Sequence, residues 1–282
     1  MTVCAAVLCK DEYDIIEFTI RHLLDQVDHV IAVDNGSSDG TRETLVRLGS
    51  EPRAGRASLD IWDDEEVGYY QSAKMTQLAE HAREAGHDWF IPCDADEYWF
   101  SPFGRLADVI PAVVEREPLT LFFSADLLNH VTTGEDDAAV PDPFTRIGYR
   151  LAERNALPKV ACRLVDGLRI GMGNHDAVAP GIVRSGGGNT IPGELVVHHF
   201  PWRSEEQFLR KITNGSRAYA ATNLHESFGE HWRQFGLPED LGFEDRVRGW
   251  FREWGYREDP AAEGHPGGDL LYDPAVHPSQ RP

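Results

Sequence analysis

Acidic residues follow three short apolar stretches in the first hundred residues, and their spacing suits the binding of a cation. Asp34 follows HVIAV, Asp63 follows SLDIW, and Asp94-Ala95-Asp96-Glu97 follows WFIPC. On an extended segment Asp94 and Asp96 project to the same side, so their carboxylates can converge on one ion. Carboxylates are ligands of Mg²⁺ and Mn²⁺, which often complete their coordination with substrate phosphates. A lone Asp-x-Asp is weak evidence, because an acidic solvated turn has the same sequence.

The elements that must position these acids alternate between strand and helix patterns. Apolar runs predict strands over residues 3–9, 29–33, 58–62 and 89–93, and helical spacing predicts helices over 15–27, 41–48 and 72–85. This alternation predicts an α/β fold with a central, mostly parallel sheet flanked by helices. In such sheets ligands bind outside the carboxyl ends of the strands, where the three acidic groups lie.

The rest of the chain is less regular. Strands are expected over 119–124, 159–165 and 194–199, with a polar loop over 132–143 and a glycine-rich connection over 180–192. Ser204 with Glu205, Glu206 and Gln207 predicts a capped helix running to about residue 221. A short helix over 244–254 and an irregular tail are expected after it.

Composition excludes several classes of partner. The 282 residues contain 27 Lys and Arg against 47 Asp and Glu, a net charge of −20, which disfavours nucleic acid and anionic membrane surfaces. No apolar run approaches the roughly 20 residues that span a bilayer, and no basic leader precedes the first run. We therefore expect a cytoplasmic protein without a transmembrane segment. Its four cysteines are expected to be reduced core residues.

A family resemblance rests on several of these motifs together. The stretch VDNGSSDGT (33–41), followed some fifty residues later by DADE, resembles the family 2 glycosyltransferases, which have the GT-A fold. Cys9-Lys10-Asp11-Glu12, Gly173-Asn174-His175-Asp176 and HHFPWRSEEQF (198–208) are similar to motifs of its soluble bacterial branch. The resemblance is specific over residues 3–99, moderate over 159–219 and absent from the tail.

The resemblance implies a nucleotide-diphosphate sugar donor, of the uridine or guanosine type, and Mn²⁺ or Mg²⁺ bound at the DADE motif. It implies a catalytic domain over 1–224, with a nucleotide-sugar-binding half (1–100) and an acceptor half (101–224), and a C-terminal extension over 225–282. Donor residues carried over by position are Asp34, Asn35 and Asp63 for the nucleoside, Lys74 for the diphosphate and Asp94 for ribose or sugar, with Asp96 holding the metal. Many members have a second Asp where Asn35 stands, so the base cannot be inferred from it.

An inverting transfer also needs a group that removes the proton of the acceptor hydroxyl. We expect Asp176 to be this base and His175 to orient it or to touch the acceptor, with Asp126, on another expected loop, as the rival base. His198 and His199 end a strand and point to opposite faces, so only one of them can readily reach the metal or pyrophosphate.

Basic residues gather in the helix after these histidines. Helical spacing puts Arg203, Arg210 and Arg217 on one face. Arg210 and Lys211 are expected to face the diphosphate; the alternative is ion pairing with the acidic surface.

These observations together predict a soluble, metal-dependent glycosyltransferase, inverting in mechanism, that acts on a small-molecule or saccharide acceptor. The sequence lacks GxGxxG after the first strand, GxxxxGK[ST] and GxSxG, which disfavours dehydrogenases, P-loop enzymes and serine hydrolases. Two alternatives remain, a sugar-phosphate nucleotidyltransferase and a non-catalytic nucleotide- or sugar-binding protein. The oligomeric state is not predicted.

Overall fold

The computed structural model describes residues 1–52, 55, 57–182, 190–225 and 228–276. The chain forms two compact units. Unit 1 comprises Met1–Asp64, Gln71–Leu127 and Asn155–His198, and unit 2 comprises Glu65–Tyr70, Leu128–Arg154 and His199–Pro282. These units do not coincide with the halves expected from the sequence, because each is assembled from three separate segments. Within the described residues, no helix is long and apolar enough to cross a bilayer.

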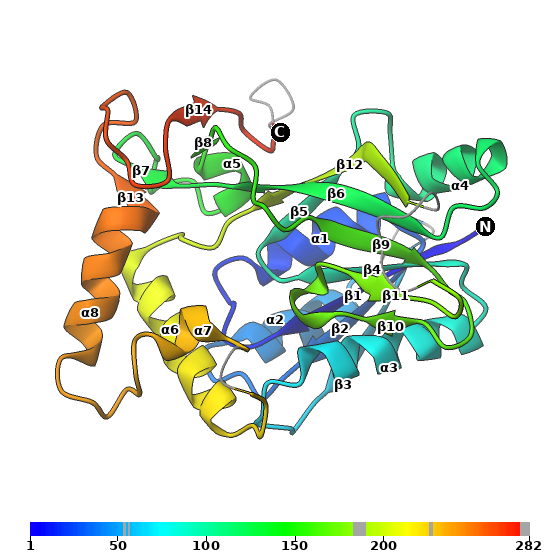
Figure 1. Cartoon of the computed structure of the whole chain (residues 1–282), viewed down its shortest axis with the longest axis horizontal. Coiled ribbons are helices and arrows are strands. Elements are labelled where there is room, and N and C mark those ends of the chain that lie inside the picture. The colour runs from blue at the N-terminus through cyan, green and yellow to red at the C-terminus, as the bar shows by residue number, and fades with distance from the viewer. Residues whose placement is uncertain (53–54, 56, 183–189, 226–227, 277–282) are drawn as a thin grey trace. The chain divides into compact units, whose positions relative to one another are not determined.

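Eight strands form the main sheet in the described part of the chain, in the order β3-β2-β1-β4-β9-β6-β12-β5 (Figure 1). Their bounds are β1 Val3–Cys9, β2 His29–Asp34, β3 Ser58–Asp63, β4 Trp89–Asp94, β5 Glu97–Phe100, β6 Phe122–Asn129, β9 Lys159–Arg163 and β12 Thr190–His199. Strands β3, β2, β1 and β4 pair in parallel, whereas β9 pairs antiparallel with β4 and β6. The predicted α/β class with a mostly parallel central sheet flanked by helices is confirmed.

Helices and short strands complete the two units. The helices are α1 Ile16–Gln26, α2 Thr41–Ser50, α3 Gln71–Glu84, α4 Leu106–Arg116, α5 Pro143–Arg146, α6 Glu205–Ala220, α7 Glu230–Arg233 and α8 Phe243–Trp250, with a 3₁₀ turn η1 Met172–Asn174 and a π turn η2 Phe251–Gly255. The short strands are β7 Thr132–Thr133, β8 Tyr149–Leu151, β10 Arg169–Ile170, β11 Ala177–Val178, β13 Tyr256–Arg257 and β14 Leu270–Tyr272.

Several sequence expectations need correction. Helix α2 continues through Gly49 to Ser50, because Gly49 packs against Ile61 of β3 and tertiary contact outweighs its low helix propensity. Helix α4 was not expected, since Pro111 lies inside it, yet its apolar face is buried in the core. The strand expected over 119–124 is β6, which begins and ends later. The expected connection over 180–192 falls partly on residues 183–189, outside the described residues.

The C-terminal tail is more regular than expected. Strand β13 pairs with β7 and β14 pairs with β8, all within unit 2. The expected polar loop over 132–143 therefore begins with a strand, and α5 starts at its last residue. These pairings join sequence positions more than 100 residues apart, which local sequence patterns do not reveal.

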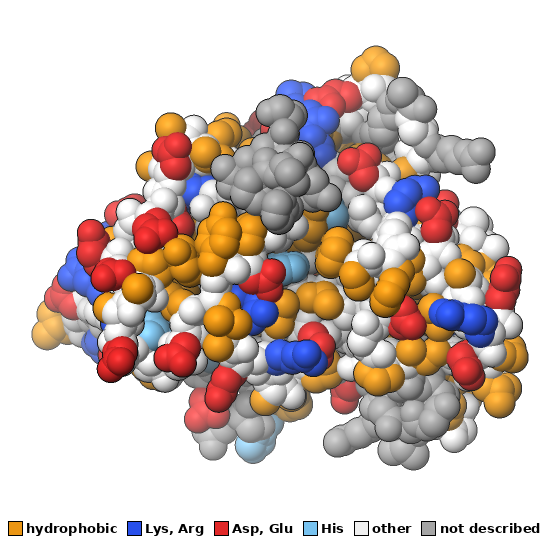
Figure 2. Space-filling model, turned by 90° about the horizontal axis from the view of Figure 1, so that it is seen from above, with side chains coloured by type: hydrophobic (Ala, Val, Ile, Leu, Met, Phe, Trp, Pro, Cys, Tyr) orange, Lys and Arg blue, Asp and Glu red, His pale blue; other side chains and the backbone are white. Residues whose placement is uncertain are grey.

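On one face of the molecule the acidic side chains of the described residues do not form one large patch (Figure 2). On the face drawn in Figure 2, red acidic side chains lie singly among blue basic and orange hydrophobic ones. Many acids are paired at close range, as in Glu17 with Arg21 and Arg47 on α1 and α2. Such pairs neutralise acids locally, but the 20 acids in excess of the bases are not compensated by them.

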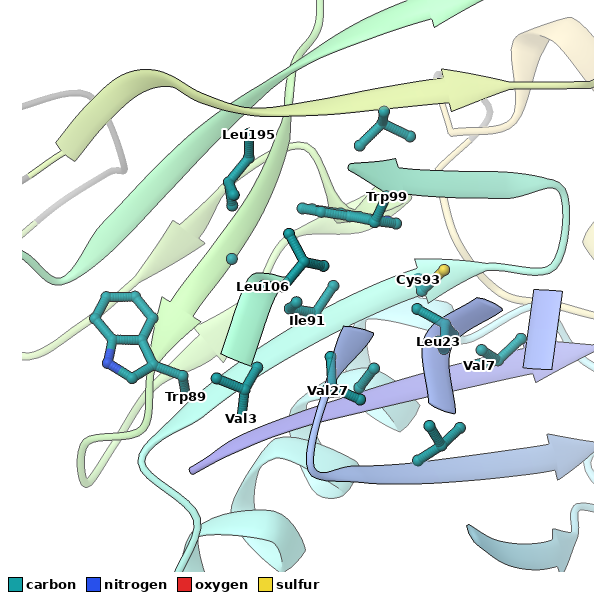
Figure 3. Close-up of a cluster of buried hydrophobic side chains, with 14 of the residues drawn as sticks. Val3, Val7, Leu23, Val27, Trp89, Ile91, Cys93, Trp99, Leu106 and Leu195 are labelled. Carbon is teal, nitrogen blue, oxygen red and sulfur yellow. The ribbon is translucent and has the colours of Figure 1, made fainter. Parts of the chain in front are cut away.

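Two apolar layers hold unit 1 together, one on each face of the sheet. Side chains of α1, α2 and α4 pack on one face against β1, β2 and β4. Figure 3 shows this layer, in which Val3, Val7 and Ile91 of the strands meet Leu23 of α1 and Leu106 of α4. On the other face α3 packs with Met75, Leu78, Ala79 and Ala82. The four cysteines are buried and free, as predicted.

Candidate donor site at the strand ends

The strand register places the acidic strand ends at one edge of the sheet. Asp34 of β2 lies beside Cys9 of β1 and beside Asp63 of β3. Asp94 of β4 lies beside Leu8 of β1. This is the carboxyl edge, where ligands bind in α/β sheets.

Asp34 presents a buried acceptor that has no partner. The residue is 3% exposed, and its Oδ2 accepts a hydrogen bond of 3.1 Å from the backbone N–H of Ser37. Its Oδ1 is buried and meets no donor among the described residues. A buried carboxylate oxygen without a donor is costly, so it marks a position where a ligand can donate.

The loops after β1 and β2 are tied together beside Asp34. Lys10 Nζ donates to the carbonyl of Asn35 (2.9 Å), and the carboxylate of Asp11 accepts from the N–H of Ser38 (2.6 Å). Asp11 has φ 54° and Gly36 has φ 66°, so both loops turn through left-handed conformations. These hydrogen bonds join the loop that contains Lys10 and Asp11 to the loop that contains Asn35 and Ser38.

Asp64, one position beyond the predicted Asp63, is the acid that contacts Asn35 and Lys74. Asn35 Nδ2 donates to the Oδ2 and the carbonyl of Asp64, at 2.9 and 3.0 Å, and Lys74 of α3 forms an ion pair with the same carboxylate. Asp63 instead points away, 59% exposed, and pairs with Arg42 of α2. Neighbouring residues of an extended segment face opposite sides, so Asp64, and not the predicted Asp63, contacts Asn35.

Asp94 is held by three protein groups. Its Oδ1 accepts from Gln71 Nε2 (2.8 Å) and Asn174 Nδ2 (3.1 Å), and its Oδ2 accepts from Lys159 Nζ (2.7 Å). Gln71 also accepts from the N–H of Gly173 (2.9 Å), which ties α3 to η1. Asn174 is fully buried with φ 60°, and its Oδ1 has no partner in the described structure.

Lys159 connects Asp94 to a second buried carboxylate. Its ammonium lies 2.7 Å from Glu97 Oε1 and donates to the carbonyl of Gly173 (2.8 Å). Burial alone would lower the pKa of Lys159, but Asp94 and Glu97 outweigh it and raise that pKa above its ordinary value. Burial raises the pKa of Glu97, although Lys159 opposes the shift. Two carboxylates and one ammonium thus form a fixed interior group with an excess of negative charge.

The DADE segment is a turn and not the extended segment expected. β4 ends at Asp94, Ala95 and Asp96 form the turn, and β5 begins at Glu97. Asp96 is 3% exposed, and both oxygens of Asp94 are already engaged.

The described residues suit a metal ion whose remaining coordination positions are filled by the substrate. The only trio of Asp, Glu, His or Cys ligand atoms within 4.8 Å of one another in that part of the chain contains neither Asp94 nor Asp96. Mg²⁺ and Mn²⁺ commonly use one or two carboxylates together with waters and substrate phosphates. Asp96 and a bound diphosphate meet that requirement.

The two histidines at the end of β12 lie in different surroundings. His198, 6% exposed, faces the rings of Tyr98 and Phe100 in unit 1. His199, in unit 2, is hydrogen-bonded through Nδ1 to Asn129 Oδ1 (2.8 Å). The alternation expected from the strand is thus present.

The two candidate bases lie on different elements. Asp176 follows η1, half-buried, with its carboxylate against Gly171, while His175 Nδ1 lies 2.9 Å from the carbonyl of Pro158. Asp126 lies inside β6, which corrects its expected place on a loop.

The predicted basic face of the helix after β12 is only partly formed. Arg203 precedes α6 and donates to the carbonyl of Phe200 (2.9 Å), and Arg217 pairs with Glu239 (2.9 Å). Arg210 and Lys211 lie in α6, within unit 2. Ser204 caps α6 by accepting from the N–H of Gln207 (3.1 Å), as predicted.

Comparison with protein families gives a match over the part of the chain that carries these strand ends. Residues 4–112 match the family model described as Glycosyl transferase family 2. This segment belongs to glycosyl transferase family 2. None of the curated proteins matches the chain in sequence.

Several solved structures resemble the chain that carries this family 2 segment. Mannosyltransferase PcManGT from Pyrobaculum calidifontis, in complex with GDP-Man and Mn²⁺, is 15% identical over 94% of this chain and 77% of its own, with a TM-score of 0.43. S. aureus TarS 1–349 is 14% identical over 89% and 78%, with a TM-score of 0.39. Mannosyl-3-phosphoglycerate synthase from Rubrobacter xylanophilus is 22% identical over 45% and 40%, with a TM-score of 0.33. Scores this low decide neither the fold nor the activity.

Sequence reasoning missed several polar residues that surround the strand ends of the family 2 segment. They are Asp64, Gln71, Glu97, Lys159 and Asn174. Two of them carried a signal: Lys159 opens an otherwise apolar strand, and Glu97 adjoins the DAD motif. The bonds of Gln71 and Asn174 to Asp94 depend on contacts 23 and 80 residues apart in sequence.

Proposed function

We propose that this protein transfers a sugar from a nucleoside-diphosphate sugar to an acceptor hydroxyl, with inversion at the sugar carbon and with Mn²⁺ or Mg²⁺ bound. The observation that carries the proposal is the unpartnered Asp34 Oδ1, at the carboxyl edge of the family 2 segment. A ribose hydroxyl or a base N–H can supply the missing donor. The bond from Asn35 to Asp64 fixes the neighbouring polar groups for the same nucleoside.

The remaining groups suit the rest of the donor. Lys74 can offset charge on the diphosphate, and the free Oδ1 of Asn174 can accept from a sugar hydroxyl beside Asp94. Asp96 would hold the metal ion, which when bound neutralises charge on the leaving diphosphate. Arg210, Lys211, His198 and His199 stay predictions for contact with the metal or the diphosphate.

The transfer forms a bond from the acceptor oxygen to the sugar carbon as the bond from that carbon to the diphosphate oxygen breaks. Asp176 would take the proton of the acceptor hydroxyl, with His175 orienting it. Asp126 is the alternative base. The leaving group departs as a nucleoside diphosphate.

Product analysis tests this proposal. Purified protein is incubated with uridine and guanosine diphosphate sugars and Mn²⁺, and slow hydrolysis or transfer is followed by chromatography. We expect release of the nucleoside diphosphate. Release of pyrophosphate from a nucleoside triphosphate would instead indicate a nucleotidyltransferase, and binding without turnover a binding protein. Asp96→Asn is expected to abolish turnover, whereas Asp108→Asn, on the exposed side of α4, provides the matched control.

A second comparison tests the assignment of Asp64. Asp64→Asn removes the charge beside Asn35 and Lys74, so we expect the Kd of the nucleoside diphosphate to change by at least about 10-fold, since a hydrogen bond to a charged group contributes about 1.5–3 kcal/mol. Asp63→Asn affects only an exposed pair with Arg42 and should leave that Kd nearly unchanged. Calorimetry measures the Kd of both variants. A larger effect of Asp63→Asn would support Asp63, as predicted from the sequence, as the residue that contacts the nucleoside.

A further inference from the structure

A second group of metal-ligating side chains lies at the opposite, amino edge of the parallel strands. Cys4 lies in β1, His29 opens β2 and His87 precedes β4. The Cys4 sulfur and one ring nitrogen of each histidine lie within 4.8 Å of one another. The register pairs Cys4 directly with His29, so the backbone of two adjacent strands sets this approach.

We propose that Cys4, His29 and His87 bind a zinc-type divalent cation, with Asp60 or a water as the fourth ligand. Thiolate sulfur and imidazole nitrogen are both ligands of Zn²⁺, which binds sulfur at about 2.3 Å and nitrogen at about 2.0 Å. A tetrahedron with these bonds has ligand atoms about 3.3–3.5 Å apart. Because the three ligand atoms lie within 4.8 Å of one another, binding would require them to close by no more than about 1.5 Å.

The histidines are oriented as ligands would be. His29 Nδ1 lies 2.6 Å from Ser58 Oγ, and donation to that hydroxyl leaves Nε2 with the lone pair that a metal needs. His87 Nδ1 is buried and finds no hydrogen-bond partner within the described chain. The two rings stack with their centroids 5.1 Å apart.

Charge and access also suit a cation. Asp60 Oδ2 lies 3.5 Å from His29 Nε2, and its side chain is 53% exposed, so the group opens to solvent on that side. Cys4 itself is fully buried. On binding, the sulfur–hydrogen bond breaks, the proton passes to solvent and the sulfur–metal bond forms.

Cobalt substitution gives a direct test, because a thiolate bound to Co²⁺ absorbs in the near ultraviolet. Metal-free protein is titrated with Co²⁺ and then with Zn²⁺, in the Asp96→Asn background so that the donor site does not compete. We expect one equivalent of Co²⁺ to produce the thiolate band and Zn²⁺ to abolish it. No thiolate band in a folded protein overturns the proposal.

Variants assign the ligands. Cys4→Ser should remove the band, while Cys162→Ser, another buried thiol packed on the same face of the sheet, should keep it. Because Cys4→Ser can disturb the core, His87→Gln at a half-buried position serves as the second variant. His87→Gln should raise the Kd for Zn²⁺ by at least about 10-fold. Removing a residue that only hydrogen-bonds to a metal ligand already weakens metal affinity by about 10- to 100-fold. Unchanged Zn²⁺ affinity in His87→Gln would overturn the proposal.

Discussion

Lys159 shows at the scale of one residue why the donor site is rigid. Its ammonium lies between Asp94 and Glu97; Lys159 and Glu97 are removed from solvent, whereas the side chain of Asp94 is 27% exposed. Breaking a buried ion pair leaves a carboxylate without its counter-charge in a medium that solvates it poorly. Asp94 therefore acts in the fold, in addition to the contact with the sugar that we propose for it.

Replacing this ammonium should destabilise the protein strongly. For Lys159→Met we expect a loss of about 3–5 kcal/mol in the free energy of unfolding, because Glu97 stays fully buried, and Asp94 partly buried, without their cation. Urea unfolding followed by circular dichroism measures it. Arg42→Met, which removes only an exposed pair with Asp63, is the control and should cost much less. Equal effects would contradict the proposed role of burial.

His22 makes stability depend on pH. Burial, with His198 nearby, lowers the pKa of His22 to about 4 from its ordinary value of 6.5, although its bond to the carbonyl of Trp99 opposes the shift. Between pH 6.5 and 4 the unfolded chain thus binds a proton that the folded chain does not. Stability should fall as the pH falls through this window.

The variant His22→Gln should reduce this dependence. We expect the difference in unfolding free energy between pH 7 and pH 4.5 to shrink by no more than about 3 kcal/mol, since one pKa unit corresponds to about 1.4 kcal/mol. Denaturant unfolding at both pH values measures it, and the exposed His225→Gln is the control. An unchanged difference in His22→Gln would show that His22 is not the group responsible.

At the scale of an element, the turn over η1 positions both Asn174 and Asp176. Gly171 has an ordinary φ of −75°, but a Cβ there would lie 1.7 Å from Asp176 Oδ1. The close approach of carboxylate and backbone is therefore what requires glycine. A side chain at this position must push the carboxylate of Asp176 aside.

Gly171→Ala accordingly tests Asp176 as the base without removing it. We expect kcat to fall by at least about 10-fold, since a positioned base contributes about 10²–10⁴-fold, while Tm changes little because one flexible side chain gives way. Gly249→Ala in α8, where a Cβ meets nothing, is the control for alanine itself. If kcat is unchanged in both Gly171→Ala and Asp176→Asn, Asp176 is not the base and Asp126 becomes the candidate.

At the scale of the whole molecule, the net charge of −20 opposes an anionic donor. A nucleoside diphosphate brings further negative charge to an edge that already holds Asp34, Asp64, Asp94 and Asp96. Asp96 would hold a divalent ion, whose positive charge would offset this repulsion.

Removal of the metal should therefore weaken donor binding. With a chelator in excess, we expect the Kd for uridine or guanosine diphosphate to rise by at least about 10-fold relative to Mn²⁺, and calorimetry measures this. Asp96→Asn should bind equally weakly with and without Mn²⁺. Full affinity in the chelator would contradict a bridging metal.

Much of the parallel half of unit 1 could be predicted from the sequence. The strands β1 to β4 and the helices between them follow from apolar runs and helical spacing, because a strand buried on both faces must be apolar throughout. The same patterns placed Asp34, Asp94 and Asp96 at strand ends. The periodicity of apolar residues is a local property, so the local sequence is enough to predict these strands and helices.

Only the tertiary structure decided which polar groups meet. It selected Asp64 over Asp63 beside Asn35, joined Lys159 to Asp94 across 65 residues, and made Ala95-Asp96 a turn. It also brought Cys4, His29 and His87 to the far edge of the sheet. Side-chain direction at a strand end and contacts between distant segments depend on register and packing, which no local pattern of residues contains.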